Sequence, residues 1–376
     1  MSKKIIYALI IILVIIAGAA VFIRQFSGQQ EETGANGGKE SNKHLSYFRS
    51  INDDETMALA GTHEFWRKGN NLYITSIKDH GLNVFDISDP ANPKFISAFS
   101  DDEKTLMKRG HSVMFSGNYA FVSATGDNAI QVFDISDPIK ISPVSIIKEK
   151  EGEKSCLKGL HGIGIKGNYL YAAGTGDNSV CIADISDPKN PRLVKTIFDS
   201  GELVLRGPHS IHFIENYLYV LGDEGLQVFD ISEPTNPKPV FLTTEGVKGG
   251  HDLKQKGNYL YTVGYQDGLS VFNVTNPKEP VRIAGISPAE ESGLYFASDG
   301  DIIGNYWFVV SEKSNSLIMV DISSPSNPTI KEILRFDEEK TPFLYNGHTI
   351  RAIGNYLYVA GLQDGFGIIK FSETVK

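Results

Sequence analysis

Residues 117–138 read GNYAFVSATGDNAIQVFDISDP, and this stretch is the unit from which the chain is built. The unit recurs seven times, at spacings of 42 to 50 residues. Its copies begin at Gly69, Gly117, Gly167, Glu215, Gly257, Gly304 and Gly354. Fixed periods of about 20 to 50 residues are typical of solenoids and propellers. The sequence therefore indicates a repeat array.

Each copy contains signals for four short β-strands, as the third copy illustrates. Residues 168–172 mix aromatic and apolar side chains, and residues 180–185 alternate before the turn at Asp187. Such runs favour strands, and the glycine and aspartate between them favour a tight hairpin. A further strand follows at residues 192–197, and a fourth precedes the aromatic strand, as at residues 112–115. We therefore predict an all-β fold, a seven-bladed β-propeller of four-stranded antiparallel blades.

Length and charge limit the number of domains and the kinds of partner that the chain can have. The chain has 376 residues, a formal charge of −9 and a pI near 5.5. Single cores stop growing near about 250–300 residues, but a ring of blades escapes this limit because each blade packs only on its neighbours. We therefore predict one propeller domain over residues 45–376. An acidic chain without a basic stripe argues against a nucleic-acid partner.

The amino terminus carries an apolar segment. Residues 5–23 are apolar or small and are flanked by Lys3, Lys4 and Arg24. About 20 such residues suffice to cross a bilayer as a helix, and the lysines favour a cytoplasmic amino terminus. We predict that residues 1–24 are a single-pass transmembrane anchor and that the propeller is extracytoplasmic at the cell membrane. A cleaved signal peptide, which makes the protein secreted, is the alternative, because residues 17–19 resemble a cleavage site.

A polar segment separates the anchor from the propeller. Residues 25–44 are rich in Gly, Gln, Glu, Asn and Ser. Such a composition buries too little apolar surface to order itself. We therefore predict a flexible linker.

The seventh copy of the unit is incomplete. It ends at residues 367–371 without a fourth strand. At the other end of the propeller, residues 45–51 precede an acidic loop, Gly61 and His63, an order that residues 95–111 repeat. A propeller needs its first and last blades joined, because open sheet edges invite aggregation. We therefore predict that residues 45–51 supply the outer strand of the seventh blade.

The third strand of each copy carries a family resemblance. Residues 317–321 read LIMVD, residues 82–86 read LNVFD and residues 226–230 read LQVFD, and each is followed by a turn that contains proline. This pattern resembles the LVIVD repeat, and the resemblance extends over about residues 63–371. It implies a β-propeller and a location on the cell surface or outside the cell. The family has no agreed activity, so the resemblance assigns no catalytic residues.

Two cysteines occur in the chain. Cys156 precedes the third blade, and Cys181 lies in the third strand of that blade. In an oxidising compartment they can pair, but a repeat fold needs no such link. A disulfide and two free thiols are therefore both open at this point.

Six of the nine histidines occupy one position in the repeat, just before the innermost strand. They are His63, His111, His161, His209, His251 and His348. In a propeller this position lies on one rim of the central channel, which we call the histidine face. One hypothesis is a ring of imidazoles that binds a metal or transfers protons, since neutral histidine is a common metal ligand.

The second and favoured hypothesis is a structural His–Asp pair in each blade. An aspartate lies at the turn between the second and third strands, and an imidazole that donates to a carboxylate is oriented and satisfied. The predicted pairs are His63–Asp79, His111–Asp127, His161–Asp177, His209–Asp223, His251–Asp267 and His348–Asp364. WD-repeat propellers have a similar arrangement. In the sixth blade Asp301 replaces the histidine and Lys313 lies at the turn, a joint change that favours contact between the partners.

Four cations lie two or three residues before the histidines of blades two to five. Beside a channel mouth, they favour capture of a carboxylate or phosphate. The predicted binding rim comprises Arg109, His111, Lys158, His161, Arg206, His209, Lys248 and His251.

The sequence favours a binding or interaction module over an enzyme. Its predicted partners are a surface protein, a glycan or a small anionic ligand, besides the membrane. The alternative is a channel-mouth enzyme, a metal-assisted hydrolase or a lyase that uses His161 or His209 with Arg206. No nucleophile elbow, phosphate-binding glycine loop or zinc motif occurs in the chain. We therefore predict no cofactor and name no catalytic residue.

Overall fold

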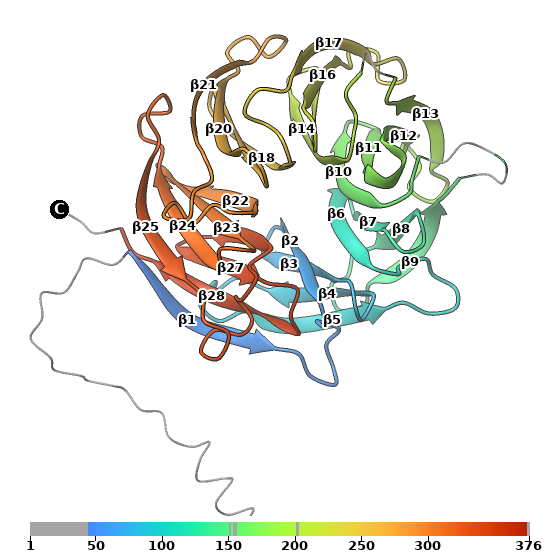
Figure 1. Ribbon diagram of the computed structural model, residues 1–376. Coiled ribbons are helices and arrows are strands. Elements are labelled where there is room, and N and C mark those ends of the chain that lie inside the picture. The colour runs from blue at the N-terminus through green and yellow to red at the C-terminus, as the bar shows by residue number, and fades with distance from the viewer. Residues whose placement is uncertain (1–43, 150–151, 153–155, 201–202, 374–376) are drawn as a thin grey trace, which may run out of the picture. The chain divides into compact units, whose positions relative to one another are not determined.

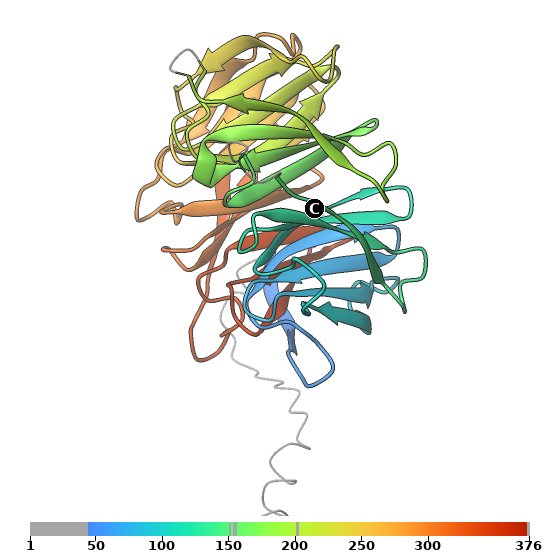
Figure 2. The same cartoon turned by 90° about the vertical axis from the view of Figure 1, so that its right-hand side faces the viewer.

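The computed structural model describes residues 44–149, 152, 156–200 and 203–373. Its strands form seven four-stranded sheets, which follow one another around a ring in chain order (Figure 1). Neighbouring strands in every sheet are antiparallel. Figure 2 shows the same sheets from the side. The prediction of an all-β, seven-bladed propeller is confirmed.

The strands fall into four classes by their place in a blade. The inner strands, beside the channel, are β2 (Thr62–Lys68), β6 (Gly110–Ser116), β10 (Leu160–Lys166), β14 (Pro208–Ile214), β18 (Gly250–Lys256), β22 (Ala297–Ile303) and β26 (Thr349–Ile353). The second strands are β3 (Asn71–Ser76), β7 (Tyr119–Ala124), β11 (Tyr169–Gly174), β15 (Tyr217–Gly222), β19 (Tyr259–Gly264), β23 (Tyr306–Ser311) and β27 (Tyr356–Ala360). The third strands are β4 (Gly81–Asp86), β8 (Ala129–Asp134), β12 (Ser179–Asp184), β16 (Leu226–Asp230), β20 (Gly268–Asn273), β24 (Ser316–Asp321) and β28 (Gly365–Phe371). The outer strands are β5 (Lys94–Ser100), β9 (Ser142–Ile147), β13 (Arg192–Phe198), β17 (Lys238–Thr243), β21 (Val281–Ile286), β25 (Thr329–Arg335) and β1 (Leu45–Asn52).

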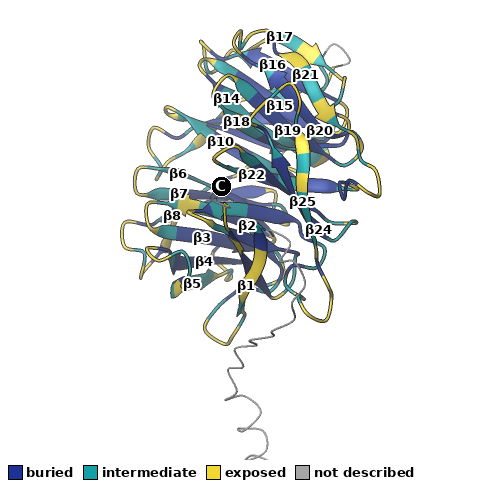
Figure 3. Cartoon of the chain, turned by 90° about the vertical axis from the view of Figure 1, so that its left-hand side faces the viewer, coloured by how far each residue is buried: buried dark blue, intermediate teal, exposed yellow. Residues whose placement is uncertain are grey.

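The hydrophobic core lies between neighbouring blades. Phe121 of β7, for example, packs in one buried cluster with Leu170 of β11 in the next blade. The aromatic residue of the second strand is fully buried in most blades, as at Tyr73, Tyr171, Tyr219, Tyr261 and Tyr358. Burial of one such side chain contributes about 2 kcal/mol, which explains why each copy repeats it. Figure 3 shows β3 and β4 mostly buried and β1 largely exposed.

The aspartate that ends most third strands fixes the turn that follows. Asp86, Asp134 and Asp184 each accept a hydrogen bond through Oδ1 from the backbone N–H two residues later, at 2.8, 2.9 and 3.0 Å. A short carboxylate favours such a turn because it replaces a backbone acceptor. The repeated Asp-Ile-Ser sequence therefore sets the exit from the strand.

The amino-terminal strand closes the ring. β1 pairs antiparallel with β28, and Leu45 lies opposite Phe371 (Figure 1). The guanidinium of Arg49 also donates to Asn92 Oδ1 of the first blade, at 2.9 Å. The prediction that residues 45–51 complete the seventh blade is confirmed.

Two predicted segments precede the propeller. The predicted anchor at residues 1–24 and nearly all of the linker at residues 25–44 lie outside the described residues. Within the ranges that are described, no helix is both long and apolar enough to span a bilayer. The transmembrane helix therefore remains a prediction.

The two cysteines form a disulfide. The bond joins Cys156, in the loop before the third blade, to Cys181 in β12. Both side chains are buried in the core between the second and third blades. The structure thus selects the paired alternative over two free thiols.

Candidate functional site

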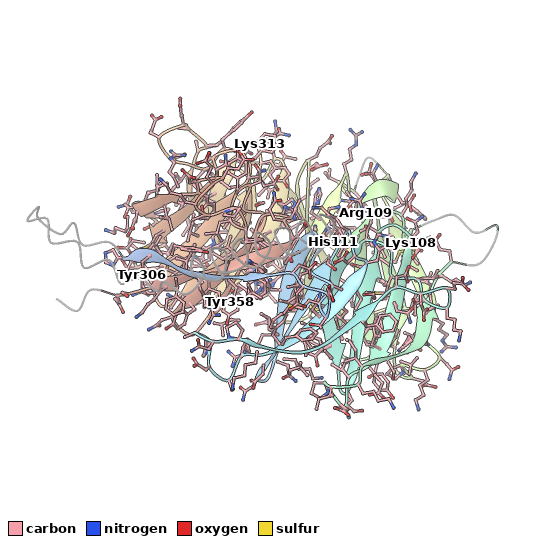
Figure 4. All side chains as sticks on the ribbon, turned by 90° about the horizontal axis from the view of Figure 1, so that it is seen from below. Lys108, Arg109, His111, Tyr306, Lys313 and Tyr358 are labelled. Atoms are coloured by element: carbon pink, nitrogen blue, oxygen red, sulfur yellow. A yellow bond between two sulfur atoms is a disulfide. The ribbon has the colours of Figure 1, made fainter. Side chains whose placement is uncertain are left out.

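The six histidines enter the central channel at corresponding positions. Five of them are the second residue of an inner strand, and His348 directly precedes β26. Each blade places the same strand beside the channel, so the repeat brings the imidazoles to one end of it. Figure 4 labels His111 and shows Arg109 near it, above Tyr306 and Tyr358 in this view.

The six imidazoles form a closed ring of contacts across the blade boundaries. Centroids of neighbouring rings are 3.7 to 5.6 Å apart. In order around the channel, the pairs are His63–His111, His111–His161, His161–His209, His209–His251, His251–His348 and His348–His63. The histidines therefore meet between blades.

The turn aspartates have a different role from the one predicted. His209 Nε2 does lie 3.4 Å from Asp223 Oδ1, so this pair is in contact. In four other blades the aspartate accepts a hydrogen bond of 2.8 or 2.9 Å from the backbone N–H three residues before the histidine, as at Asp79, Asp127, Asp177 and Asp267. Asp364 forms an ion pair of 3.1 Å with Lys78. The predictions to be corrected are His63–Asp79, His111–Asp127, His161–Asp177, His251–Asp267 and His348–Asp364.

The sixth blade explains why the pairing was predicted. Ser298 occupies the histidine position there, because β22 pairs with β23 in the register that β18 adopts with β19. Asp301 lies three residues further along the strand. At the turn, Ser314 Oγ, and not Lys313, accepts the hydrogen bond from the Tyr295 N–H at 3.1 Å. The joint change that favoured a His–Asp contact therefore came from a wrong alignment of this blade.

Groups from neighbouring blades orient part of the histidine ring. His348 Nδ1 lies 2.8 Å from Glu312 Oε1, and the Tyr265 hydroxyl donates to the same oxygen at 2.9 Å. His251 Nδ1 lies 2.7 Å from the carbonyl oxygen of Ser298. A carbonyl only accepts, so this nitrogen of His251 carries the proton. The other nitrogen, Nε2, is then left with a lone pair.

The most buried histidines are held in the neutral form. Burial, followed by the neighbouring imidazole of His111, lowers the pKa of His63 well below its usual value. Burial also lowers the pKa of His111, although Glu64, 3.4 Å from its Nδ1, opposes the shift. In the described part of the chain, the buried Nδ1 atoms of His63 and His111 make no hydrogen bond. His63 therefore supplies a neutral imidazole with an unused nitrogen in this half of the ring, whereas Nδ1 of His111 faces Glu64.

Replacing His63 by leucine will reduce the acid sensitivity of the fold. The folded-state pKa of His63 lies below its ordinary value of 6.5, so between the two values the unfolded chain binds more protons than the folded one. The stability that neutral His63 contributes is therefore present above about pH 6.5 and is lost as the pH falls below it. Between about pH 6.5 and 5.5, we expect the wild type to lose about 1 kcal/mol more than His63→Leu in urea unfolding. Equal losses in the two proteins would contradict this expectation.

A cavity of about 440 Å³ extends from the histidines along the channel. Five of the six ring histidines and His212 line it, together with charged groups that the sequence reading missed. Lys254 Nζ lies 3.1 Å from Asp252 and 3.7 Å from Asp299, and Arg351 lies 3.9 Å from Asp301. The sequence did contain a signal. The residue three places after the histidine position is charged in blades five to seven, and the residue one place after it is aspartate in blades five and six, whereas blades two and three carry Ser, Gly or Met at these places.

The two aspartates beside Lys254 differ in their pKa values. Burial raises the pKa of Asp252, and the charge of Asp299 adds to that shift against the attraction of Lys254. Burial acts in the same direction on Asp299, but Lys254 and Arg351 together lower the pKa of this carboxyl. Asp252 is thus the proton carrier of this cluster.

The four predicted rim cations lie outside the cavity lining. The lining includes His111, His161, His209 and His251 of the predicted rim, but none of Arg109, Lys158, Arg206 and Lys248, all of which the structure describes. Arg206 is exposed and forms ion pairs with Glu224 at 2.9 Å and Asp199 at 3.8 Å. The enzyme hypothesis combined Arg206 with His161 or His209. Arg206 does not join these imidazoles in the cavity lining.

Two groups of side chains have the donor atoms that a metal ion needs. In each group, three potential ligand atoms lie within 4.8 Å of one another. The groups are His161, His209 and His251, and His63, Glu64 and His111. Imidazole nitrogens with a carboxylate suit Zn²⁺, Cu²⁺, Ni²⁺ or Fe²⁺.

Comparison with solved structures finds the same fold in very different proteins. The Cps50 (Swd1) β-propeller domain of Myceliophteria thermophila matches with a TM-score of 0.65 and 13% identity, over 87% of this chain and 100% of that one. A protein of Lactobacillus plantarum matches with a TM-score of 0.62 and 13% identity, over 83% and 88%. A protein of Bacteroides fragilis, proposed to be a 6-phosphogluconolactonase, matches with a TM-score of 0.61 and 16% identity, over 76% and 86%. At such identities the likeness shows the fold alone. Comparison with curated proteins gave no match.

The family model of the LVIVD repeat matches six segments of the chain. They are residues 62–101, 109–146, 161–199, 208–243, 297–335 and 347–373. The fifth blade, at residues 250–286, lies between two of these matches and has the same four strands, β18 to β21. The matched segments amount to more than half of the sequence. The chain therefore belongs to the LVIVD repeat family.

Proposed function

We propose that this protein is a binding module that takes a small cationic ligand into the histidine end of its central channel. A ring of blades supports this role, because it is a rigid scaffold that presents side chains from many strands at one opening. The observation that carries the proposal is the cavity of about 440 Å³, which is lined by six histidines, five of them from the ring. Its volume falls within the range typical of small-ligand sites.

The charge around the channel favours a cation. Six carboxylates contact the imidazoles or the two cations of the channel, and they belong to Glu64, Asp223, Asp252, Asp299, Asp301 and Glu312. The cations are Lys254 and Arg351, so negative charge remains in excess even with Asp252 protonated. Such a field raises the local concentration of positive ligands. The predicted anionic ligand is therefore less favoured inside the cavity, and a surface protein or glycan would bind at the outer loops.

Cationic and anionic probes will separate these alternatives. We expect calorimetry on the full chain in detergent to detect binding of at least one of Zn²⁺, choline and spermidine, and of neither phosphate nor citrate. Ser210 lines the cavity and makes no side-chain hydrogen bond in the described residues, so Ser210→Trp fills the cavity and will abolish that binding. Ser287→Trp, the same change at an exposed position, is the control. Binding of phosphate or citrate alone, or unchanged binding by Ser210→Trp, would sink the proposal.

We also propose that residues 1–24 anchor an extracytoplasmic propeller. The apolar run at residues 5–23 supports this location, as does the Cys156–Cys181 disulfide, because disulfides persist in oxidising compartments. Cell fractionation tests it: the full chain will remain with membranes after an alkaline wash, and protease added outside the cytoplasmic membrane will cleave the propeller. Recovery of the full chain from the cytosol would exclude this location.

A further inference from the structure

We infer that His161, His209 and His251 form a binding site for a divalent transition-metal ion of the zinc type. This inference deepens the proposed function, on which it rests, by naming the class of the cation. The three residues hold the same position in β10, β14 and β18, the inner strands of three consecutive blades. The site is therefore built by the repeat itself.

The distances between the imidazole nitrogens suit a tetrahedral ion. The ligand atoms of the three histidines all lie within 4.8 Å of one another, and the Nδ1 atoms of His161 and His209 are 3.3 Å apart. Two nitrogens that each lie about 2.0–2.1 Å from Zn²⁺ at the tetrahedral angle are separated by about 3.3 Å. Two of the three nitrogens are thus already at the spacing that a bound ion requires, and the ion would replace the hydrogen bond that joins them.

Contacts of the other ring nitrogens present lone pairs to the site. His251 Nδ1 donates to the Ser298 carbonyl oxygen at 2.7 Å, which leaves Nε2 of that ring as an acceptor. His209 Nε2 lies 3.4 Å from Asp223 Oδ1, which favours the proton on Nε2 and the lone pair on Nδ1. Metal-binding histidines commonly donate their second N–H to a carbonyl or a carboxylate in this way. Asp223 and Ser298 therefore act as positioning residues.

The site is open on one side. All three histidines line the 440 Å³ cavity and are half-buried, so an ion can enter from the channel. Three imidazoles leave the fourth position of a tetrahedral ion free for water or a second ligand. Asp299 supplies negative charge within the same cavity. This arrangement suits an exchangeable ion.

The second group of potential ligands is a weaker candidate. Glu64 Oε2 already accepts a hydrogen bond from Trp66 Nε1 at 2.6 Å, and its Oε1 lies 3.4 Å from His111. His63 is buried and is not among the residues that line the cavity. An ion would have less access to this group, so it serves as the internal comparison.

Zinc titration of matched variants tests the assignment. The full chain in detergent, stripped with a chelator, will bind one Zn²⁺ by calorimetry, and Co²⁺ in its place will give the visible absorption of a tetrahedral complex. His161→Gln, His209→Gln and His251→Gln will each weaken binding by more than about tenfold. Asp223→Asn will weaken it by about tenfold, because the second nitrogen of His209 loses its carboxylate.

Glu64→Gln and His111→Gln test the second group and will bind Zn²⁺ more tightly than His161→Gln does. His80→Gln, which changes a histidine outside the cavity lining, is the matched control and will bind Zn²⁺ as the wild type does. Circular dichroism and thermal unfolding verify that each variant is folded. No binding by the folded wild type, or loss of binding in Glu64→Gln and His111→Gln with retention in His161→Gln, would overturn the inference. A third outcome is that choline or spermidine binds, that Ser210→Trp abolishes this binding, and that Zn²⁺ does not bind. This outcome would refute the metal site and support the proposed function. If no probe binds, the metal site and the proposed function are both refuted.

Discussion

Deletion of residues 45–52 will lower the free energy of unfolding by on the order of 5 kcal/mol, a large part of the stability of a folded domain. The deleted strand, β1, contributes seven paired residues to the seventh blade. Its loss leaves β28 as an open sheet edge and removes Leu45 from the cluster that also contains Phe308 and Phe371. We expect a lower urea midpoint for the full chain with this deletion, and cleavage by protease at the exposed seventh blade.

A rescue variant makes this expectation specific. The carbonyl oxygen of His44 accepts a hydrogen bond of 2.9 Å from the Ser372 N–H, so the start of β1 lies beside the end of β28. In the deleted chain, residues 44–52 placed after Glu373 through an Asn-Gly turn will form a hairpin with β28 and restore stability. If the deletion variant is as stable as the wild type, or if the relocated strand restores nothing, β1 does not hold the ring closed.

Loss of the Cys156–Cys181 disulfide will cost about 3 kcal/mol. The bond closes a loop with a sequence separation of 25, and opening it releases the unfolded chain from that restraint. It also ties the loop before the third blade to β12 in the middle of the core. We expect Cys156→Ala, Cys181→Ala and the double variant to be destabilised by similar amounts in urea unfolding, because each change breaks the same bond.

Reduction of the wild type is the companion measurement. A reductant will lower the urea midpoint of the wild type and leave that of the double alanine variant unchanged. A thiol assay verifies that the bond is open. A wild type with two measured thiols and an unchanged midpoint would refute a stabilising disulfide.

The repeat and its closure were readable from the sequence because they depend on local chemistry. Hairpin turns, aromatic strands and the aspartate after the third strand recur with each copy, and each acts within a few residues of its position. The missing fourth strand of the last copy then implied β1, since residues 45–63 have the same order of strand, acidic loop and histidine as residues 95–111. The pairing of the cysteines remained open because the repeat pattern does not include them.

The site was predictable in position but not in its contacts. The histidines were expected at the channel rim, and they lie there. Their partners were sought inside the blade because His and Asp recur together, yet Asp127 binds the Lys108 N–H while His111 meets His63 and His161. Contacts between blades depend on how close seven inner strands approach around an axis, which no single copy records. The cluster around Lys254 was missed for the same reason, because its side chains come from three blades.

The closing strand also has a consequence for biosynthesis. His44 and Ser372, which lie side by side in the folded ring, are 328 positions apart in the chain. The ribosome therefore synthesises β1 long before its partner strand β28. Until β28 has been synthesised, the seventh blade of the nascent chain is incomplete. A chain that stops early never acquires that partner and keeps an unpaired edge for proteases and chaperones to recognise. Closure of the ring thus reports that translation has passed β28.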